Sequence, residues 1–240
     1  MLEMLDGLAD AYINVGALLG SDGLEGEELF GEIRKMGPMK RAKLINAMTK
    51  QGASSRGSRA EMEKHFHELP EHIRNGIING DLRLADTVIY SIKPVSSKTI
   101  KLFETQDDKE IGLRNISNAK LPKNQALLVS GIVLLAGIPA TTEKEKVMAT
   151  QFAGIETFPA IANGEFSLKS NKKQIVPETG SYVFKTNNMH NLPIGYYKLA
   201  NPRLIHDDIL IELTIELGTM EGLDPKTHIY AGLHGTITTP

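Results

Sequence analysis

The nine residues Ile-Leu-Ile-Glu-Leu-Thr-Ile-Glu-Leu at positions 209–217 carry the clearest folding signal in the chain. Their odd-numbered positions are all Ile or Leu, whereas three of the four even-numbered positions are Glu or Thr. Alternation with a period of two places successive side chains on opposite faces of a β-strand. The stretch therefore predicts a strand with one face buried and the other in solvent. The same alternation recurs at residues 229–237 near the C-terminus.

Shorter strand candidates occur through the second two-thirds of the chain. They are residues 87–92, 99–103, 126–136, 165–170, 181–185 and 194–199. Turn-forming pairs lie between them, namely Asn163-Gly164, Ser170-Asn171, Thr179-Gly180, Asn201-Pro202 and Asp224-Pro225. No strong helical segment separates these candidates, which argues against a parallel βαβ arrangement. We therefore expect residues 86–240 to form an antiparallel sandwich or barrel.

The longest uncharged run, residues 124–142, has two interpretations. A membrane-spanning helix needs roughly 20 apolar residues, and this run is short and interrupted by Ser130, Gly131, Gly137 and Pro139. A short apolar run bounded by turn residues is typical of a strand that is buried on both faces. We therefore expect a buried strand and no transmembrane segment.

The first 85 residues have a different pattern, with apolar residues at helical spacing, and we expect a helical N-terminal extension. Residues 1–33 contain eight acids and no Lys or Arg, whereas residues 34–60 contain eight bases and no acid. Lys and Arg can contact nucleic-acid phosphates without reading sequence, and the basic block could equally pair with the acidic block of the same or a neighbouring chain. The candidate nucleic-acid or intersubunit contacts are Arg34, Lys35, Lys40, Arg41, Lys43, Lys50, Arg56 and Arg59.

Composition and motifs exclude several function classes. The 240 residues carry a formal net charge of −2, so bulk charge does not indicate a nucleic-acid binder. The absence of cysteine excludes disulfides, zinc–thiolate sites and cysteine nucleophiles. The chain lacks the Walker A, Rossmann, G-x-S-x-G and H-E-x-x-H motifs. His228 and His234 would share a strand face with Tyr230, but no nearby acid completes a metal site. We therefore predict no catalytic residue, metal or cofactor.

The layout of the chain resembles the single jelly-roll capsid proteins of small icosahedral viruses and phages. In that family a basic N-terminal arm precedes an eight-stranded sandwich, and the stretches Gly112–Pro139 and His206–Pro240 are the most similar in character. The acidic block ahead of the basic one departs from the family pattern. The resemblance implies a mainly β fold of jelly-roll type, a structural rather than enzymatic role, and location in the virion after assembly in the host cytoplasm. The implied partners are copies of the same chain, the viral genome and other virion proteins.

Two other functions remain open from the sequence. The first is a β-sandwich binding module for carbohydrate or a host surface, as in a viral spike or adhesin. Carbohydrate sites commonly stack sugars on aromatic rings, but the chain has no Trp, and core packing is the expected use of the adjacent pair Tyr196-Tyr197. The second is a cupin-like enzyme, which would need a cluster of metal ligands that the sequence pattern does not provide.

Overall fold

Nine strands and several short helices make up the part of the chain that the computed structural model describes, namely residues 37, 62–186 and 193–240. The strands are β1 (Arg83–Pro94), β2 (Thr99–Lys101), β3 (Ala126–Gly137), β4 (Ala153–Gly154), β5 (Glu165–Ser170), β6 (Lys173–Gly180), β7 (Tyr196–His206), β8 (Ile211–Glu216) and β9 (His228–Thr239). The helices are α5 (Glu71–Asn79), α6 (Lys144–Met148) and α7 (Pro159–Ala162), with 3-10 turns η1 (Phe66–Glu68), η2 (Ile155–Thr157) and η3 (Ser181–Phe184).

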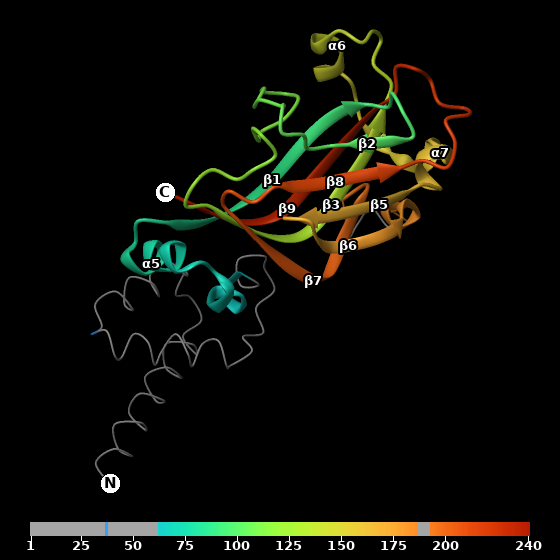
Figure 1. The fold of residues 1–240 in the computed structure, drawn as a ribbon. Helices are drawn as coiled ribbons and strands as arrows, with labels where there is room; N and C mark the ends of the chain where they lie inside the picture. Colours follow the sequence, from blue (N-terminus) through green and yellow to red (C-terminus); the bar gives the residue numbers. More distant parts are fainter. Residues whose placement is uncertain (1–36, 38–61, 187–192) are drawn as a thin grey trace.

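The strands form two antiparallel sheets (Figure 1). In the first sheet, β9 lies between β1 and β3, and both β7 and the short β4 pair along the other edge of β3. The second sheet has the order β2-β8-β5-β6. Each pairing between these strands is antiparallel. The prediction of a mainly β chain with antiparallel sheets is therefore confirmed.

Side chains from both sheets meet in one apolar core. In β8, Ile211, Leu213 and Ile215 are at most 2% exposed and belong to this core, while the residues between them are more exposed. In β9, alternate residues from Ile229 to Leu233 reach the same core. The alternation in the sequence therefore predicted the buried faces of both strands correctly, because a strand directs successive side chains to opposite sides.

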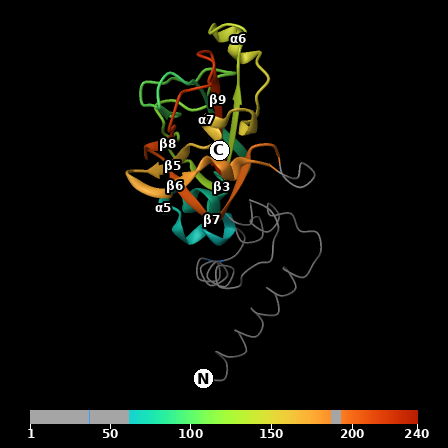
Figure 2. The ribbon, with the colours of Figure 1, turned by 90° about the vertical axis from the view of Figure 1, so that its right-hand side faces the viewer.

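Strand β3 is buried on both faces, as the uncharged run at residues 124–142 predicted. Leu127 and Val129 face the common core, whereas Ala126 and Leu128 contact a second apolar cluster. That cluster is formed by residues 62–82, including the helix α5. Figure 2 shows α5 and α6 at opposite ends of the folded region. No helix within residues 62–186 or 193–240 is long and apolar enough to cross a membrane.

Several local predictions were wrong or incomplete. Residues 181–185 are not a strand but contain η3, in which Ser181 and Phe184 are buried three residues apart, a spacing that suits a 3-10 turn. Strand β6 was not predicted, because Pro177 and two register shifts interrupt its alternation. The turn expected at Thr179-Gly180 is wrong, because these residues end β6 and pair with Phe166 and Glu165. Strand β7 continues through Asn201-Pro202, which was expected to be a turn. The Ser170-Asn171 turn is correct: Asn171 and Lys172 have positive φ and form the two-residue loop between β5 and β6.

The predicted N-terminal extension is described only from residue 62 onward. From there, η1 and α5 pack against the outer face of the first sheet through Phe66, Ile73 and Ile77. Strand β1 begins at Arg83 and pairs with the last strand from its first residue. Apart from Gly37, the acidic block 1–33 and the basic block 34–60 lie outside the described residues. The helical structure expected there, and the division of the chain at residues 85 and 86, stay predictions.

Candidate functional site

The sequence placed its candidate contacts in the basic block, and the structure does not describe them. Arg34, Lys35, Lys40, Arg41, Lys43, Lys50, Arg56 and Arg59 all lie outside the described residues. Their predicted contact with nucleic acid or a neighbouring chain therefore stays a prediction. The polar groups that the structure does bring together lie on the folded β region.

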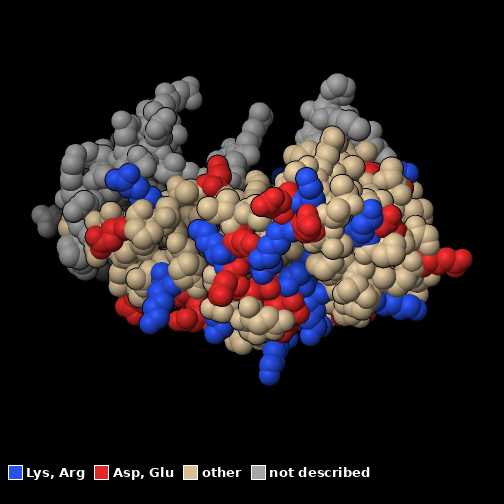
Figure 3. Space-filling model, turned by 90° about the horizontal axis from the view of Figure 1, so that it is seen from above, with Lys and Arg blue, Asp and Glu red and all other residues tan. Residues whose placement is uncertain are grey.

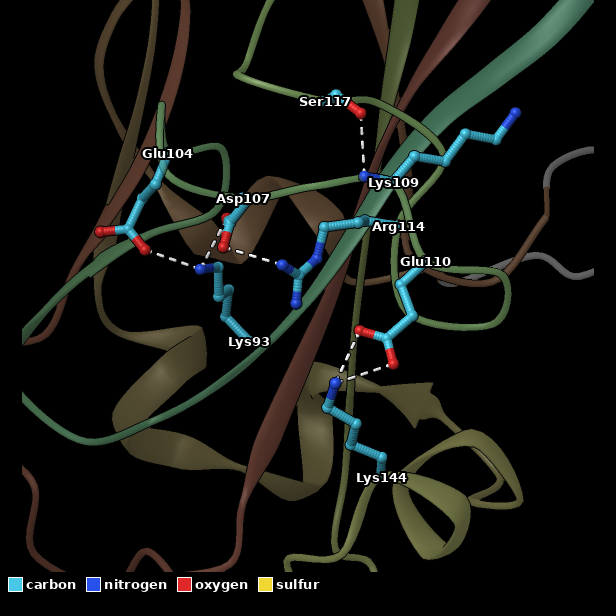
Figure 4. Close-up of polar contacts among 8 residues, drawn as sticks. All are labelled: Lys93, Glu104, Asp107, Lys109, Glu110, Arg114, Ser117 and Lys144. Atoms are coloured by element: carbon cyan, nitrogen blue, oxygen red, sulfur yellow. Dashed lines mark hydrogen bonds and ion pairs between the residues drawn. The ribbon is translucent and has the colours of Figure 1, made fainter.

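The most extensive of these is a cluster of ion pairs beside β1 (Figure 4). Lys93 on β1 reaches two carboxylates of the β2–β3 connection, with its Nζ 2.6 Å from Glu104 Oε2 and 2.7 Å from Asp107 Oδ2. Arg114, from the same connection, donates from its Nη1 to the other oxygen of Asp107 at 2.8 Å. Lys93, Asp107 and Arg114 are each less than 20% exposed. The cluster thus holds charges of both signs, each in contact with an opposite one.

A second contact joins this connection to α6. The Lys144 Nζ donates to both carboxylate oxygens of Glu110 at 2.9 Å. The backbone amide of Lys109 donates to Ser117 Oγ at 2.9 Å, which closes the connection on itself. These contacts hold a long segment against β1 and α6. These ion pairs and hydrogen bonds form a structural network, because each carboxylate in it already contacts a cationic side chain.

The sequence pattern alone did not identify this cluster. Lys93 precedes Asp107 by 14 residues and Arg114 follows it by seven, and no motif links the three positions. The cluster depends on the path of the β2–β3 connection, which the sequence pattern does not reveal. A rule that a half-buried Lys on an edge strand needs an acidic partner is the only signal that could have suggested it.

The histidines of β9 do lie on one face of the strand, as predicted, but they have different neighbours. His228 is buried, and its Nδ1 lies 2.7 Å from the carbonyl oxygen of Lys226. The His234 ring meets the Tyr196 ring edge-on, with centroids 5.6 Å apart. Tyr196 lies over Gly131 of β3, where any larger residue would collide with its ring. Across the described residues, no group of three or more His, Asp or Glu side chains is arranged to hold a metal ion.

The two adjacent tyrosines point to opposite sides of β7. Tyr197 packs edge-on against Phe166 and Phe184 in the common core, with ring centroids about 6 Å from each. Tyr196 is on the other face, against His234. The expectation that these tyrosines serve packing is confirmed for Tyr197, and the pair does not present one continuous aromatic surface.

Asp207, between β7 and β8, links three segments. Its Oδ2 accepts a hydrogen bond from the backbone amide of Asn124 at 2.8 Å and lies 3.2 Å from Nε2 of His72 on α5. Burial acts to raise the pKa of Asp207, but the Asn124 amide and the His72 and His206 rings outweigh it, so the pKa lies below its ordinary 3.8. The carboxylate therefore joins α5 to the sheets in its charged form.

Charges of both signs are interspersed over the end of the molecule seen in Figure 3. This face therefore offers no extended field of one sign for a polyanion. The chain matches no protein-family model, and a search of curated proteins found no match.

Proposed function

We propose that the chain is a structural subunit that assembles with copies of itself into a shell, with a single jelly roll as the building block. The observation that carries this proposal is the pairing of the eight longer strands. With the two-residue β4 left aside, the first strand pairs with the eighth, the second with the seventh, the third with the sixth and the fourth with the fifth. This is the pairing of one long hairpin that has been rolled up.

The remaining pairings support the same topology. Rolling the hairpin adds a contact between the eighth and third strands, which is β9 with β3, and between the seventh and fourth, which is β8 with β5. The resulting sheet orders, 1-8-3-6 and 2-7-4-5, support the proposal of a jelly roll, a double-sheet fold of viral capsids, lectins and cupins. The apolar interior favours a capsid-type building block over a cupin, because packed side chains from both sheets fill the space between the two sheets.

The charged N-terminal segment gives the second argument for assembly. Eight bases without an acid, directly after eight acids without a base, provide a segment that can bind the genome or the acidic block of a neighbouring copy. The segment precedes residue 62, where the apolar packing of the described region begins. We propose that it acts between molecules, in the virion, while residues 62–240 supply the rigid block.

The direct test is the size and shape of the purified full-length chain, measured by light scattering after size-exclusion chromatography and by negative-stain electron microscopy. Pentamers, hexamers or closed particles support the proposal. A monomer or an isolated trimer favours the binding module and contradicts it. Metal that copurifies in stoichiometric amount would instead favour the cupin-like enzyme.

A deletion separates the roles of the two regions. Removal of residues 1–60 should leave cooperative unfolding intact and abolish or change assembly; collapse of the β fold contradicts the division of roles.

Replacing the eight Lys and Arg residues of the basic block with Gln should reduce the salt dependence of single-stranded nucleic-acid binding. The slope of log K against log salt concentration should fall by about 0.7 for each Lys or Arg that contacts a phosphate. As a control, replacing the exposed Lys172 and Lys173 with Gln should change neither the salt dependence of binding nor assembly. Assembly that persists without any salt-dependent nucleic-acid binding assigns the block to the acidic segment of a neighbour.

A further inference from the structure

The outer edge of β1 is a place where another strand could pair. Strand β1 is the last strand of its sheet and uses its inner edge for β9. Its outer edge is filled by residues 113–115 of its own chain: the Ile92 amide donates to the Leu113 carbonyl at 2.8 Å, and the Asn115 amide donates to the Tyr90 carbonyl at 3.3 Å. An edge strand with unpaired backbone groups is a template for another chain. Here a short segment already occupies it.

The side chain of Asn115 extends this pairing by one further step. Its Oδ1 accepts from the Tyr90 amide at 2.8 Å, and its Nδ2 donates to the Val88 carbonyl at 2.7 Å. A carboxamide presents the same acceptor and donor as a peptide group. The Asn115 side chain therefore takes the position that the backbone of an added strand would occupy. It does so beyond the point where the backbone of residues 113–115 stops pairing with β1.

The ion-pair cluster holds this segment in place. Arg114 pairs with Asp107, which also contacts Lys93 on β1, so charged groups bridge the segment to the strand it covers (Figure 4). On the other side of the segment, Leu113 is buried with Ile92 and Val147. Ionic contacts of Arg114 and apolar contacts of Leu113 thus hold residues 113–115 at the edge of β1.

The covered part of β1 is itself prone to pair with other strands. Residues 87–92 read Thr-Val-Ile-Tyr-Ser-Ile, six residues without charge, Pro or Gly and rich in β-branched and aromatic side chains. Segments of this kind associate with identical copies when exposed on an edge. Pairing of two identical edges is also self-complementary, as a two-fold contact requires. The partner that fits this edge is therefore β1 of a second copy.

We propose that residues 113–115 are an edge guard, which occupies a strand-accepting site on β1 and prevents edge-to-edge pairing between copies of the chain. Productive contacts between copies then use surfaces other than the β1 edge. The guard acts on the folded chain whether or not that chain builds a shell, so its test is independent of the proposed function.

The test is the full-length Asn115→Ala variant, with Asn163→Ala as the control, because Asn163 is an exposed Asn outside this edge. In Asn115→Ala, we expect hydrogen exchange at the Tyr90 amide to rise about fivefold or more, since its acceptor is lost. We also expect concentration-dependent thioflavin T fluorescence that the control does not show. Asn115→Asp keeps the acceptor for Tyr90 and should give a smaller rise, which provides a readout if the alanine variant folds poorly.

A second substitution identifies the surface that associates. Thr87→Lys places a charge on a partly exposed position of β1, and Lys on an edge strand opposes pairing. Combined with Asn115→Ala, it should suppress the thioflavin T signal but leave the faster exchange at Tyr90. Unchanged exchange and unchanged association in Asn115→Ala overturn the proposal. Association that Thr87→Lys does not suppress also overturns it, because it then arises elsewhere.

Discussion

Ile73 on α5 tests whether residues 62–82 are part of the β fold or an appendage to it. Its side chain is 0% exposed and lies in the apolar cluster that also contains Ala126 and Leu128 of β3. Ile73→Ala should leave a cavity between α5 and the first sheet. Truncation of a fully buried Ile to Ala costs about 2–5 kcal/mol, because the lost burial and the residual cavity add.

The size of this loss can be compared with the stability of the whole domain. A domain of this kind has a free energy of unfolding of about 5–15 kcal/mol, so the substitution removes a large fraction of it. With a urea dependence of about 3 kcal/mol per molar, a loss of 3 kcal/mol lowers the midpoint by about 1 M. The assay is urea unfolding followed by far-ultraviolet circular dichroism, which reports on the sheets.

The matched control is Asn75→Ala, two residues away on the exposed side of α5. It should change the free energy of unfolding by no more than about 0.5 kcal/mol. The reasoning is refuted if Ile73→Ala leaves the midpoint of the sheet transition at its wild-type value, or if α5 unfolds in a separate earlier transition. Either result would mean that the cluster over β3 does not couple the helix to the sheets.

Two further predictions concern β8 and the connection that follows β7. Leu213→Glu should cost several kcal/mol and lower the thermal midpoint sharply, because it buries an unpaired charge, while Glu212→Gln on the other face should be nearly silent. Asp207→Asn should cost about 1–3 kcal/mol at neutral pH through weaker contacts to His72 and the Asn124 amide. The folded-state pKa of Asp207 is lowered, so its stabilisation is complete above 3.8 and disappears as the pH falls through the folded value. Urea midpoints of the two proteins should therefore converge in strong acid; a constant difference contradicts this account.

The strands that the sequence predicted correctly are those whose surroundings are uniform along the strand. Ile211, Leu213 and Ile215 alternate cleanly because β8 has one face in the core and one in solvent. Strand β3 was recognisable for the opposite reason, since apolar layers cover both of its faces. In both cases the environment is uniform along the strand, so local sequence carries enough information.

The failures occur where pairing is irregular. Register shifts between Phe166 and Lys169 allow β6 to contain Pro177 without alternating. Strand β7 passes through Pro202 where its register with β3 also shifts. Proline is acceptable at such positions because the ladder does not need its missing amide. An edge strand therefore tolerates residues that, read locally, predict a turn.

The polar cluster beside β1 could not be predicted for a different reason. Lys93, Asp107 and Arg114 come together only because the β2–β3 connection returns along the edge of β1. Nothing in their spacing indicates this return. The same holds for Asn115, whose amide contacts with the strand depend on the backbone of its neighbours being placed first. Contacts made by a long connection between strands can be predicted only when the path of that connection is known.

The first and last strands of the described region lie side by side in the first sheet. Arg83 at the start of β1 is opposite Thr239 at the end of β9, and the register is unbroken from there to Pro94. The start of β1 and the end of β9 therefore lie at the same end of the first sheet, and residues 62–82, which precede β1, cover the outer face of that sheet. Removing residues 1–60 leaves each of these strand pairs intact, whereas removing β9 would take away the strand between β1 and β3.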